Sequence, residues 1–355
     1  MTDFKNNGNF CFRRGGVTYR RKVVHNIFGD IISLDNLLIA WKEFRRGKRQ
    51  KKDVQEFEFN LEENLFSLHE SLLSKTYYPE SYQSFYVQDP KLRHIHKATV
   101  RDRVLHQALF RILYTIFDRQ FIYDSYSCRL GKGVHRAVNR LNDFLRKESY
   151  HYSKPIFVLK CDIRKFFDSI DQQTLLNLIK QRVVDPNTIW LVEKIIYSFE
   201  KLPDQGLPLG NVTSQLFANI YLNELDQFVK HKLRVKYYLR YCDDFAIVSD
   251  GKDYLVSLIP QINNFLNINL RLDLHPKKIT LRKFSWGVDF LGYVILPHHI
   301  LLRTKTKGRI LSRLGRGEIN EKSLPSYLGI IGHCQGFKIR KQLFIKSKEL
   351  TTSLS

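Results

Sequence analysis

The sequence has few residues of the kinds that define several large classes of protein. Its 355 residues include only five cysteines, an odd number, and no two of them form a CxxC pair. Such a pattern supports neither a disulfide framework nor a zinc site, and it is typical of a reducing compartment. No apolar run approaches the roughly 20 residues of a membrane-spanning helix, and the polar N-terminus lacks the apolar core of a signal peptide. We therefore expect a cytoplasmic chain with no membrane contact.

Acidic residues are also scarce relative to basic ones. The chain has 58 Lys and Arg against 35 Asp and Glu, a formal net charge of +23. An excess of this size favours a polyanionic partner such as nucleic acid. Aromatic residues alternate with basic ones in residues 10–22 and 41–52, as in surfaces that stack on bases while neutralising phosphates. The alternative for each patch is a solvated basic face that contributes only solubility.

The sequence contains neither a GxGxxG nor a GxxxxGK[ST] loop, and its strands and helices do not alternate regularly. This favours an α+β fold over a doubly wound sheet. Residues 57–74 indicate a strand or turn that leads into a helix, and residues 82–98 indicate a hairpin across an Asp-Pro turn. Helices are predicted behind an N-cap at Ser33 or Asp35 and over residues 99–121 and 172–183, and a Gly-Pro loop opens another long helix within residues 207–229.

Three acids stand where strands would normally be apolar. Asp162 closes a short buried strand, and Asp243 and Asp244 lie inside the sheet-forming run 237–248. If the two strands are neighbours, three carboxylates converge and repel one another unless cations compensate them. Oxygen ligands favour Mg²⁺ or Mn²⁺, and on a basic protein this predicts two-metal nucleotidyl transfer. The alternative is an ordinary hairpin turn, in which Asp is common.

The residues around these acids resemble a known family. The string Tyr241-Cys242-Asp243-Asp244 resembles the YxDD signature of reverse transcriptases, and residues 157–171 resemble their first palm motif. Further resemblances follow in the same order as in the family. They lie at residues 90–109 and 121–138 (fingers), 206–222 (palm loop), 272–281 (late palm lysine) and 288–293 (primer-grip hairpin). The resemblance to bacterial, group II intron-like reverse transcriptases runs from about residue 35 to residue 350.

One loop resembles a particular subgroup of reverse transcriptases. Residues 209–215 read Leu-Gly-Asn-Val-Thr-Ser-Gln, which is similar to reverse transcriptases of diversity-generating retroelements. Such enzymes copy a template RNA into cDNA with errors opposite adenine, together with a small basic accessory variability protein. Cys242 is unusual at its position in the signature. An intron-like or phage-defence reverse transcriptase with another template remains an alternative, as does a nucleic-acid-binding protein that kept the fold without catalysis.

The resemblance implies a right-hand polymerase with fingers, a palm made of an antiparallel sheet with helices, and a small helical thumb. We predict a basic N-terminal arm over residues 1–30, fingers with the first palm elements over 31–155, palm over 156–295 and thumb over 296–355. The expected partners are template RNA, primer or cDNA, deoxynucleotides and the accessory protein, with no membrane.

The resemblance also implies residue roles. Two Mg²⁺ ions, or Mn²⁺ in their place, would be held by the catalytic acids Asp162, Asp243 and Asp244. The predicted nucleotide-binding residues are Lys91, Arg93, Arg101, Phe167, Leu209, Gly210, Gln215 and Lys278. The predicted primer- and template-binding residues are Tyr241, Leu291, Gly292 and Tyr293.

Several of these roles have a simpler alternative. Phe167 would be the gate that excludes a 2′-hydroxyl, or else a core aromatic beside Phe166. Arg101 would contact the triphosphate, or else line a helix face. Leu209 would loosen base-pair checking, because it cannot hydrogen-bond as a Gln there could, or else be a packing substitution. Lys278 would contact phosphate or protonate pyrophosphate, although the neighbouring lysine makes the choice ambiguous.

Overall fold

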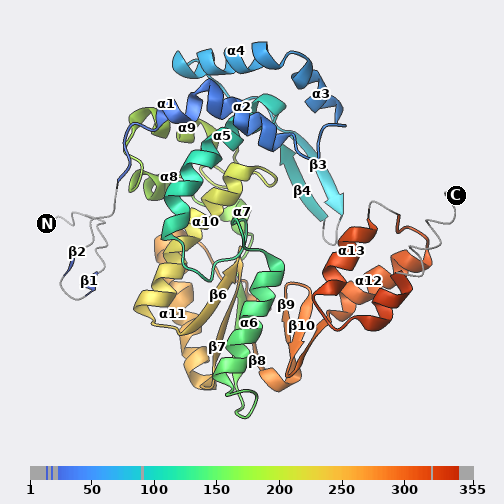
Figure 1. Cartoon of the computed structure of the whole chain (residues 1–355). Coiled ribbons are helices and arrows are strands. Elements are labelled where there is room, and N and C mark those ends of the chain that lie inside the picture. The colour runs from blue at the N-terminus through green and yellow to red at the C-terminus, as the bar shows by residue number, and fades with distance from the viewer. Residues whose placement is uncertain (1–12, 15–16, 19–22, 89–91, 321–322, 344–355) are drawn as a thin grey trace, which may run out of the picture. The chain divides into compact units, whose positions relative to one another are not determined.

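The computed structural model describes residues 13–14, 17–18, 23–88, 92–320 and 323–343. The chain divides into two compact units (Figure 1). The first contains residues 1–112 and 172–200, and the second contains residues 113–171 and 201–355. Most of the predicted N-terminal arm lies outside the described residues, apart from the paired strands β1 (Arg13–Arg14) and β2 (Val17–Thr18). The four-part division into arm, fingers, palm and thumb remains a prediction.

The first unit consists mainly of helices. Helix α2 begins at the predicted N-cap, because the Ser33 hydroxyl accepts a hydrogen bond from the Asn36 amide at 3.2 Å. Trp41 on α2 is buried and packs against Phe57 with ring centroids 5.2 Å apart. The helices of this unit are α1 (Phe28–Ile32), α2 (Leu34–Phe44), α3 (Lys52–Phe59), α4 (Leu61–Leu73), α8 (Gln172–Lys180) and α9 (Pro186–Ile196), together with the first part of α5 (Val100–Phe117).

Of the strand or turn expected at the start of residues 57–74, the strand is wrong, because residues 57–59 end helix α3. A turn at Asn60 leads into the predicted helix, which is α4. The alternation Phe-Glu-Phe suggests a strand, but Val54 and Phe57 are both buried at helical spacing and Phe59 is exposed. The packing of Phe57 on Trp41 therefore outweighs the local pattern.

The predicted hairpin of the first unit is present. Strands β3 (Gln83–Gln88) and β4 (Leu92–Lys97) pair antiparallel, from Gln83 opposite Lys97 to Gln88 opposite Leu92. Its connecting turn lies outside the described residues.

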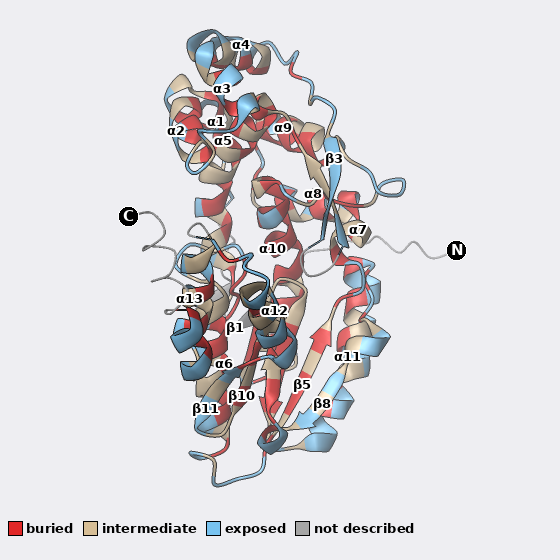
Figure 2. Ribbon diagram, turned by 90° about the vertical axis from the view of Figure 1, so that its right-hand side faces the viewer, coloured by how far each residue is buried: buried red, intermediate tan, exposed pale blue. Residues whose placement is uncertain are grey.

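The second unit is built around a four-stranded antiparallel sheet. The strand order is β6 (Tyr237–Tyr241), β7 (Asp244–Ser249), β5 (Phe157–Asp162) and β8 (Thr280–Lys283). The two central strands, β5 and β7, are therefore the ones that carry the three acids. The middle of β7 is buried, and β5 alternates between buried and partly buried residues, as its red and tan segments show in Figure 2.

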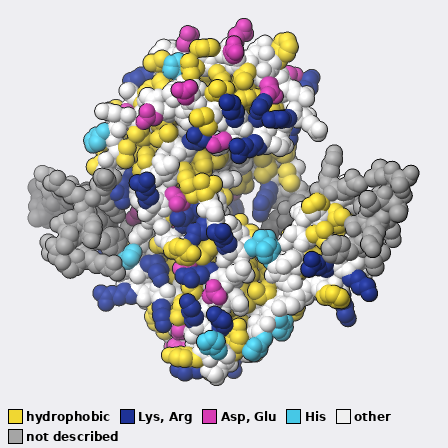
Figure 3. Space-filling model, in the orientation of Figure 1, with side chains coloured by type: hydrophobic (Ala, Val, Ile, Leu, Met, Phe, Trp, Pro, Cys, Tyr) yellow, Lys and Arg dark blue, Asp and Glu magenta, His cyan; other side chains and the backbone are white. Residues whose placement is uncertain are grey.

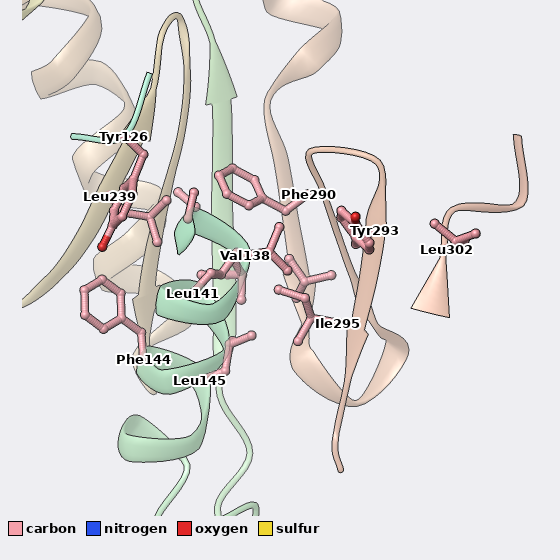
Figure 4. Close-up of a cluster of buried hydrophobic side chains, with 14 of the residues drawn as sticks. Tyr126, Val138, Leu141, Phe144, Leu145, Leu239, Phe290, Tyr293, Ile295 and Leu302 are labelled. Carbon is pink, nitrogen blue, oxygen red and sulfur yellow. The ribbon is translucent and has the colours of Figure 1, made fainter. Parts of the chain in front are cut away.

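Helices cover this sheet on both faces. Side chains alternate along each strand, so Val158 and Val248 share one face with Leu239, where they join the buried cluster of α6 (Val134–Glu148). Figure 4 shows Val138, Leu141 and Leu145 of α6 in this cluster together with Phe290 and Ile295. Helices α10 (Val212–Gln227) and α11 (Lys252–Leu270) complete this layer structure, and α11 packs against β5 and β7.

The C-terminal part of the second unit begins with a small sheet. Strands β9 (Val288–Phe290), β10 (Tyr293–Leu296) and β11 (His299–Leu302) form an antiparallel sheet in the order β11-β10-β9. The predicted helical segment follows from Thr304 onward as α12 (Thr304–Gly315) and α13 (Leu324–Gly332). Within the described ranges, no helix combines the length and apolar character needed to cross a membrane.

Candidate active site

The register of the sheet brings the three acids together. Asp162, the last residue of β5, lies directly opposite Asp244, the first residue of β7. Asp244 also pairs with Tyr241 at the end of β6, so a two-residue turn of Cys242 and Asp243 closes the hairpin. The Ile163 amide donates to the Asp243 carbonyl oxygen at 3.2 Å, which ties the turn to the segment that follows β5. The convergence expected from the sequence is thus produced by strand pairing.

The turn has an unusual backbone. Cys242 has φ of 56°, in the left-handed region that residues other than glycine rarely occupy. Such a conformation costs on the order of 1 kcal/mol or more and persists where the surrounding structure holds it. The turn that carries Asp243 therefore needs support from its neighbours.

Burial and the neighbouring negative charges raise the pKa values of two of the three carboxyl groups. Burial, followed by the nearby charge of Asp162, raises the pKa of Asp243 above its usual value. Burial and the charges of Asp162, Asp243 and Asp289 raise the pKa of Asp244 to about 6. A bound cation would oppose both shifts, because it favours the ionised carboxylates.

Two lysines contact the acids. The Lys278 Nζ donates to Asp162 Oδ1 at 2.6 Å, whereas Lys277 is exposed. Of the two neighbouring lysines, Lys278 is therefore the one at the site. Lys160 Nζ lies 3.8 Å from Asp244 Oδ2 and donates to the Asp289 carbonyl at 2.6 Å. Lys160 was not predicted, although its place two residues before Asp162 on one strand puts both side chains on the same face.

The donor set fits a hard divalent cation. Mg²⁺ is usually held by one or two carboxylates together with waters and substrate phosphates, rather than by a closed protein cage. Over the described ranges, no three or more His, Cys, Asp or Glu side chains form a group that could hold a metal ion by themselves. Asp162, Asp243 and Asp244 are the residues that would hold the ions, with phosphate oxygens completing the coordination.

The palm loop and the first palm helix lie in the same unit as the acids. In α7 (Phe166–Ser169) the Phe166 side chain is buried and that of Phe167 is partly exposed, so the core aromatic is Phe166. The Leu207 amide donates to the Phe167 carbonyl oxygen at 2.8 Å, which links α7 to the loop that carries Leu209. In that loop, Leu209 is partly buried and Gly210 is exposed with φ of 115°.

The start of α10 contains an unpredicted polar residue. Asn211 is 3% exposed, and neither atom of its side-chain amide has a hydrogen-bond partner among the described residues. Gln215, one turn later, is exposed. No pattern in the sequence distinguishes Asn211, since Asn is common at helix starts.

The predicted phosphate-binding cations belong to the first unit. Lys91 lies outside the described residues. Arg93 pairs with Val87 in the β3–β4 hairpin. Arg101 is bound locally, with Nε 3.1 Å from Glu80 Oε1 and Nη2 3.3 Å from Asp102 Oδ1. The nucleotide contacts of these three residues remain predictions.

The predicted primer-binding residues cluster on two hairpins. Tyr241 is partly buried and ends β6, next to the catalytic turn. Leu291 and Gly292 form the two-residue turn between β9 and β10, with φ of 49° and 90°. Tyr293 is buried, and its hydroxyl donates to the Ile330 carbonyl at 2.9 Å. A role of Tyr293 at the primer would therefore be indirect, through the position of this turn.

Comparison with known proteins agrees with this geometry. The family model described as reverse transcriptase (RNA-dependent DNA polymerase) matches residues 88–295. Protein YkfC of Escherichia coli (strain K12) is 24% identical over an alignment 269 positions long, which covers 64% of this chain and 70% of YkfC. Group II intron-encoded protein LtrA of Lactococcus lactis subsp. cremoris is 24% identical over an alignment 357 positions long, which covers 80% of this chain and 56% of LtrA.

A third relative is more distant. The putative COX1/OXI3 intron 2 protein of Saccharomyces cerevisiae is 21% identical over an alignment 255 positions long, which covers 54% of this chain and 29% of the yeast protein. The chain thus spans about half of LtrA and less than a third of the yeast protein. The family model covers more than half of the chain, including all three acids of the site. The chain therefore belongs to the reverse transcriptase (RNA-dependent DNA polymerase) family.

Proposed function

We propose that this chain copies an RNA template into cDNA by two-metal nucleotidyl transfer. The observation that carries the proposal is the strand register that sets Asp162 opposite Asp244, with Asp243 in the adjoining turn. When bound, Mg²⁺ would lower the pKa of the primer 3′-hydroxyl and stabilise the charge on the departing pyrophosphate. Asp162 and Asp243 would be the principal ligands, and Asp244 a third and weaker one.

Residues around the acids would position and select the nucleotide. The Lys278 ammonium group, already beside Asp162, is suited to contact a phosphate or to give a proton to pyrophosphate. The partly exposed Phe167 ring is suited to stack under the sugar and exclude a 2′-hydroxyl, because its neighbour Phe166 fills the core position. In the other unit, Lys91, Arg93 and Arg101 would bind the triphosphate.

The experiment that tests this activity is primer extension by the purified protein on an RNA template with Mg²⁺ and deoxynucleotides. We expect the primer to be extended with deoxynucleotides, and the extension to require the RNA template. Tight binding of the RNA–primer duplex without extension, with Mg²⁺ or Mn²⁺ and on several templates, would instead support a binding protein without catalysis.

We further propose that the enzyme is of the diversity-generating type and error-prone opposite template adenine, with a small basic accessory protein as partner. The loop Leu209 to Gln215 supports this subtype, because Leu209 cannot hydrogen-bond near the nascent base pair as a glutamine could. The corresponding variant is Leu209→Gln. We expect it to lower misincorporation opposite adenine while extension on the same template continues, and an unchanged error frequency would contradict the proposal.

A second candidate is a reverse transcriptase with an intron-like template. It is favoured by the alignment of 80% of this chain with group II intron-encoded protein LtrA. The two candidates differ in fidelity, since only the first predicts errors concentrated at template adenines. Sequencing the cDNA made by the unmodified chain, with and without a basic accessory protein, separates them.

A further inference from the structure

A fully buried arginine lies next to the catalytic turn. Arg240 is on β6, two residues before Cys242, and its side chain is 0% exposed. Strand alternation turns it away from the face that carries Leu239 and toward α10. There it meets Asp226, also 0% exposed, with Nε 2.8 Å from Oδ1 and Nη2 2.6 Å from Oδ2. The pair is bidentate, the strongest geometry for an arginine and a carboxylate.

The same guanidinium group reaches the strained turn. Arg240 Nη1 donates to the Cys242 carbonyl oxygen at 3.1 Å and to Asn219 Oδ1 at 3.3 Å. Its Nη2 also donates to Ser125 Oγ at 3.2 Å. All three guanidinium nitrogens therefore have acceptors, and one of these acceptors is the backbone of the turn that carries Asp243.

A contribution to folding stability does not by itself explain why an ion pair is buried here. Burying two charges costs several kcal/mol per ion, and apolar residues of similar volume are often as stabilising or more so. What an apolar pair cannot do is donate to the Cys242 carbonyl. Asp226 and Asn219 both belong to α10, which begins at Val212, two residues after Gly210. Through Arg240, the helix that follows the loop of Leu209 and Gly210 is thus bonded to the turn that carries Asp243.

We infer that Arg240 and Asp226 are positioning residues of the metal site. They hold the Cys242 carbonyl, keep the turn in its left-handed conformation and so fix Asp243 and Asp244 opposite Asp162. The inference rests on the proposed two-metal function of these acids. In many metal sites, residues that do not touch the metal hydrogen-bond and orient the residues that do. Loss of such a residue commonly weakens metal affinity by about 10- to 100-fold, and we assign this kind of role to the Arg240–Asp226 pair.

The first test is Arg240→Lys, which keeps the positive charge but cannot bond the carboxylate in bidentate fashion and the carbonyl at once. The matched control is Arg129→Lys. Arg129 is a 7% exposed arginine paired with Asp118 at 2.7 Å, and it also bonds backbone carbonyls but not the catalytic turn. We expect Arg240→Lys to weaken Mn²⁺ binding, measured by calorimetry or electron paramagnetic resonance, by at least about tenfold. The Mg²⁺ concentration that this variant needs for half-maximal primer extension should rise in parallel. Arg129→Lys should show neither change.

A second variant covers the case in which Arg240→Lys does not fold. The combination Asp226→Leu, Tyr238→Phe and Arg240→Met removes the ion pair and also the Tyr238 hydroxyl, which donates to Asp226 at 2.7 Å. Because no buried charge is left unpaired, we expect this protein to fold with cooperative thermal unfolding. It should nevertheless bind Mn²⁺ at least about tenfold more weakly than the unmodified chain.

Wild-type Mn²⁺ affinity in either folded variant would overturn the inference and leave the pair with a purely structural role. The binding measurement also separates this inference from the proposed function. If the unmodified chain binds Mn²⁺ but extends no primer, the polymerase proposal fails while the comparison of metal affinities still decides the role of Arg240.

Discussion

At the scale of single residues, the ionised form of a buried acid at the site destabilises the folded state. Asp244 is the clearest case, because its pKa of about 6 in the folded chain is above the ordinary value of 3.8. Below about pH 3 the group is protonated in the folded and unfolded states alike. As the pH rises from about 4 to about 6, the unfolded chain is ionised while the folded state keeps its proton, because burial and neighbouring carboxylates disfavour the charge. The folded state therefore loses stability over this interval.

Asp244→Asn should accordingly stabilise the protein in the presence of a chelator. The gain in the free energy of unfolding should be largest above about pH 6, at most about 3 kcal/mol, and should vanish below about pH 3. Thermal or denaturant unfolding at a series of pH values measures it. The exposed Asp250, at the far end of the same strand, provides the control Asp250→Asn. A gain that does not depend on pH would contradict the assigned cause.

The acids themselves could be predicted from the sequence, whereas their partners could not. Asp243 and Asp244 are conspicuous because charged residues rarely occur inside an apolar, sheet-forming run. Lys160 and Arg240 also lie within strands, but their partners come from distant segments: Asp289 from β9 and Asp226 from α10. Only the folded register and helix packing identify such pairs.

At the scale of elements, turns and strand pairing set the geometry of the site. The β-branched and aromatic residues of 237–248 predict either one strand or a hairpin, and the structure has the hairpin β6–β7. A strand at residues 57–59 was the wrong one of two options, because the alternating pattern there is outweighed by the burial of one helix face against Trp41. Strand β11 was missed, because its four residues lie within a segment dominated by basic and helical patterns.

The turn between β9 and β10 provides a test at this scale. Gly292 has φ of 90°, and a methyl group there would meet only Thr306 Oγ1 at 3.8 Å, so the cost of a side chain is conformational. Gly292→Ala should lower the free energy of unfolding by about 1 kcal/mol. Gly308→Ala, in α12 with open space around it, should raise the same quantity by about 0.5–1 kcal/mol. Chemical denaturation compares them, and equal effects would contradict the role given to the turn.

For the whole molecule, charge is the dominant property. The net charge is +23, and Lys and Arg side chains are distributed over the face displayed in Figure 3, among hydrophobic, Asp and Glu side chains. Charge of this kind binds nucleic acid mainly through phosphates and therefore releases counterions. This property was predictable from composition, whereas which basic residues touch the duplex was not.

Binding of a template–primer duplex should therefore depend steeply on salt. We expect the logarithm of the association constant to fall linearly with the logarithm of salt concentration. The loss should be on the order of 1,000-fold between about 50 mM and about 200 mM if six or more phosphates are neutralised. Fluorescence anisotropy with a labelled duplex measures the slope, and a flat dependence would argue that the basic surface contributes only solubility.

The central claim is that strand pairing assembles Asp162, Asp243 and Asp244 into one metal site for DNA synthesis on RNA. The most direct measurement is primer extension on an RNA template by Asp243→Asn beside Asp250→Asn, which changes an acid outside the site. Loss of a metal ligand should reduce extension by at least about 1,000-fold, with thermal stability and duplex binding retained, while Asp250→Asn extends as the unmodified chain does. Extension by Asp243→Asn at the rate of the unmodified chain would contradict the account.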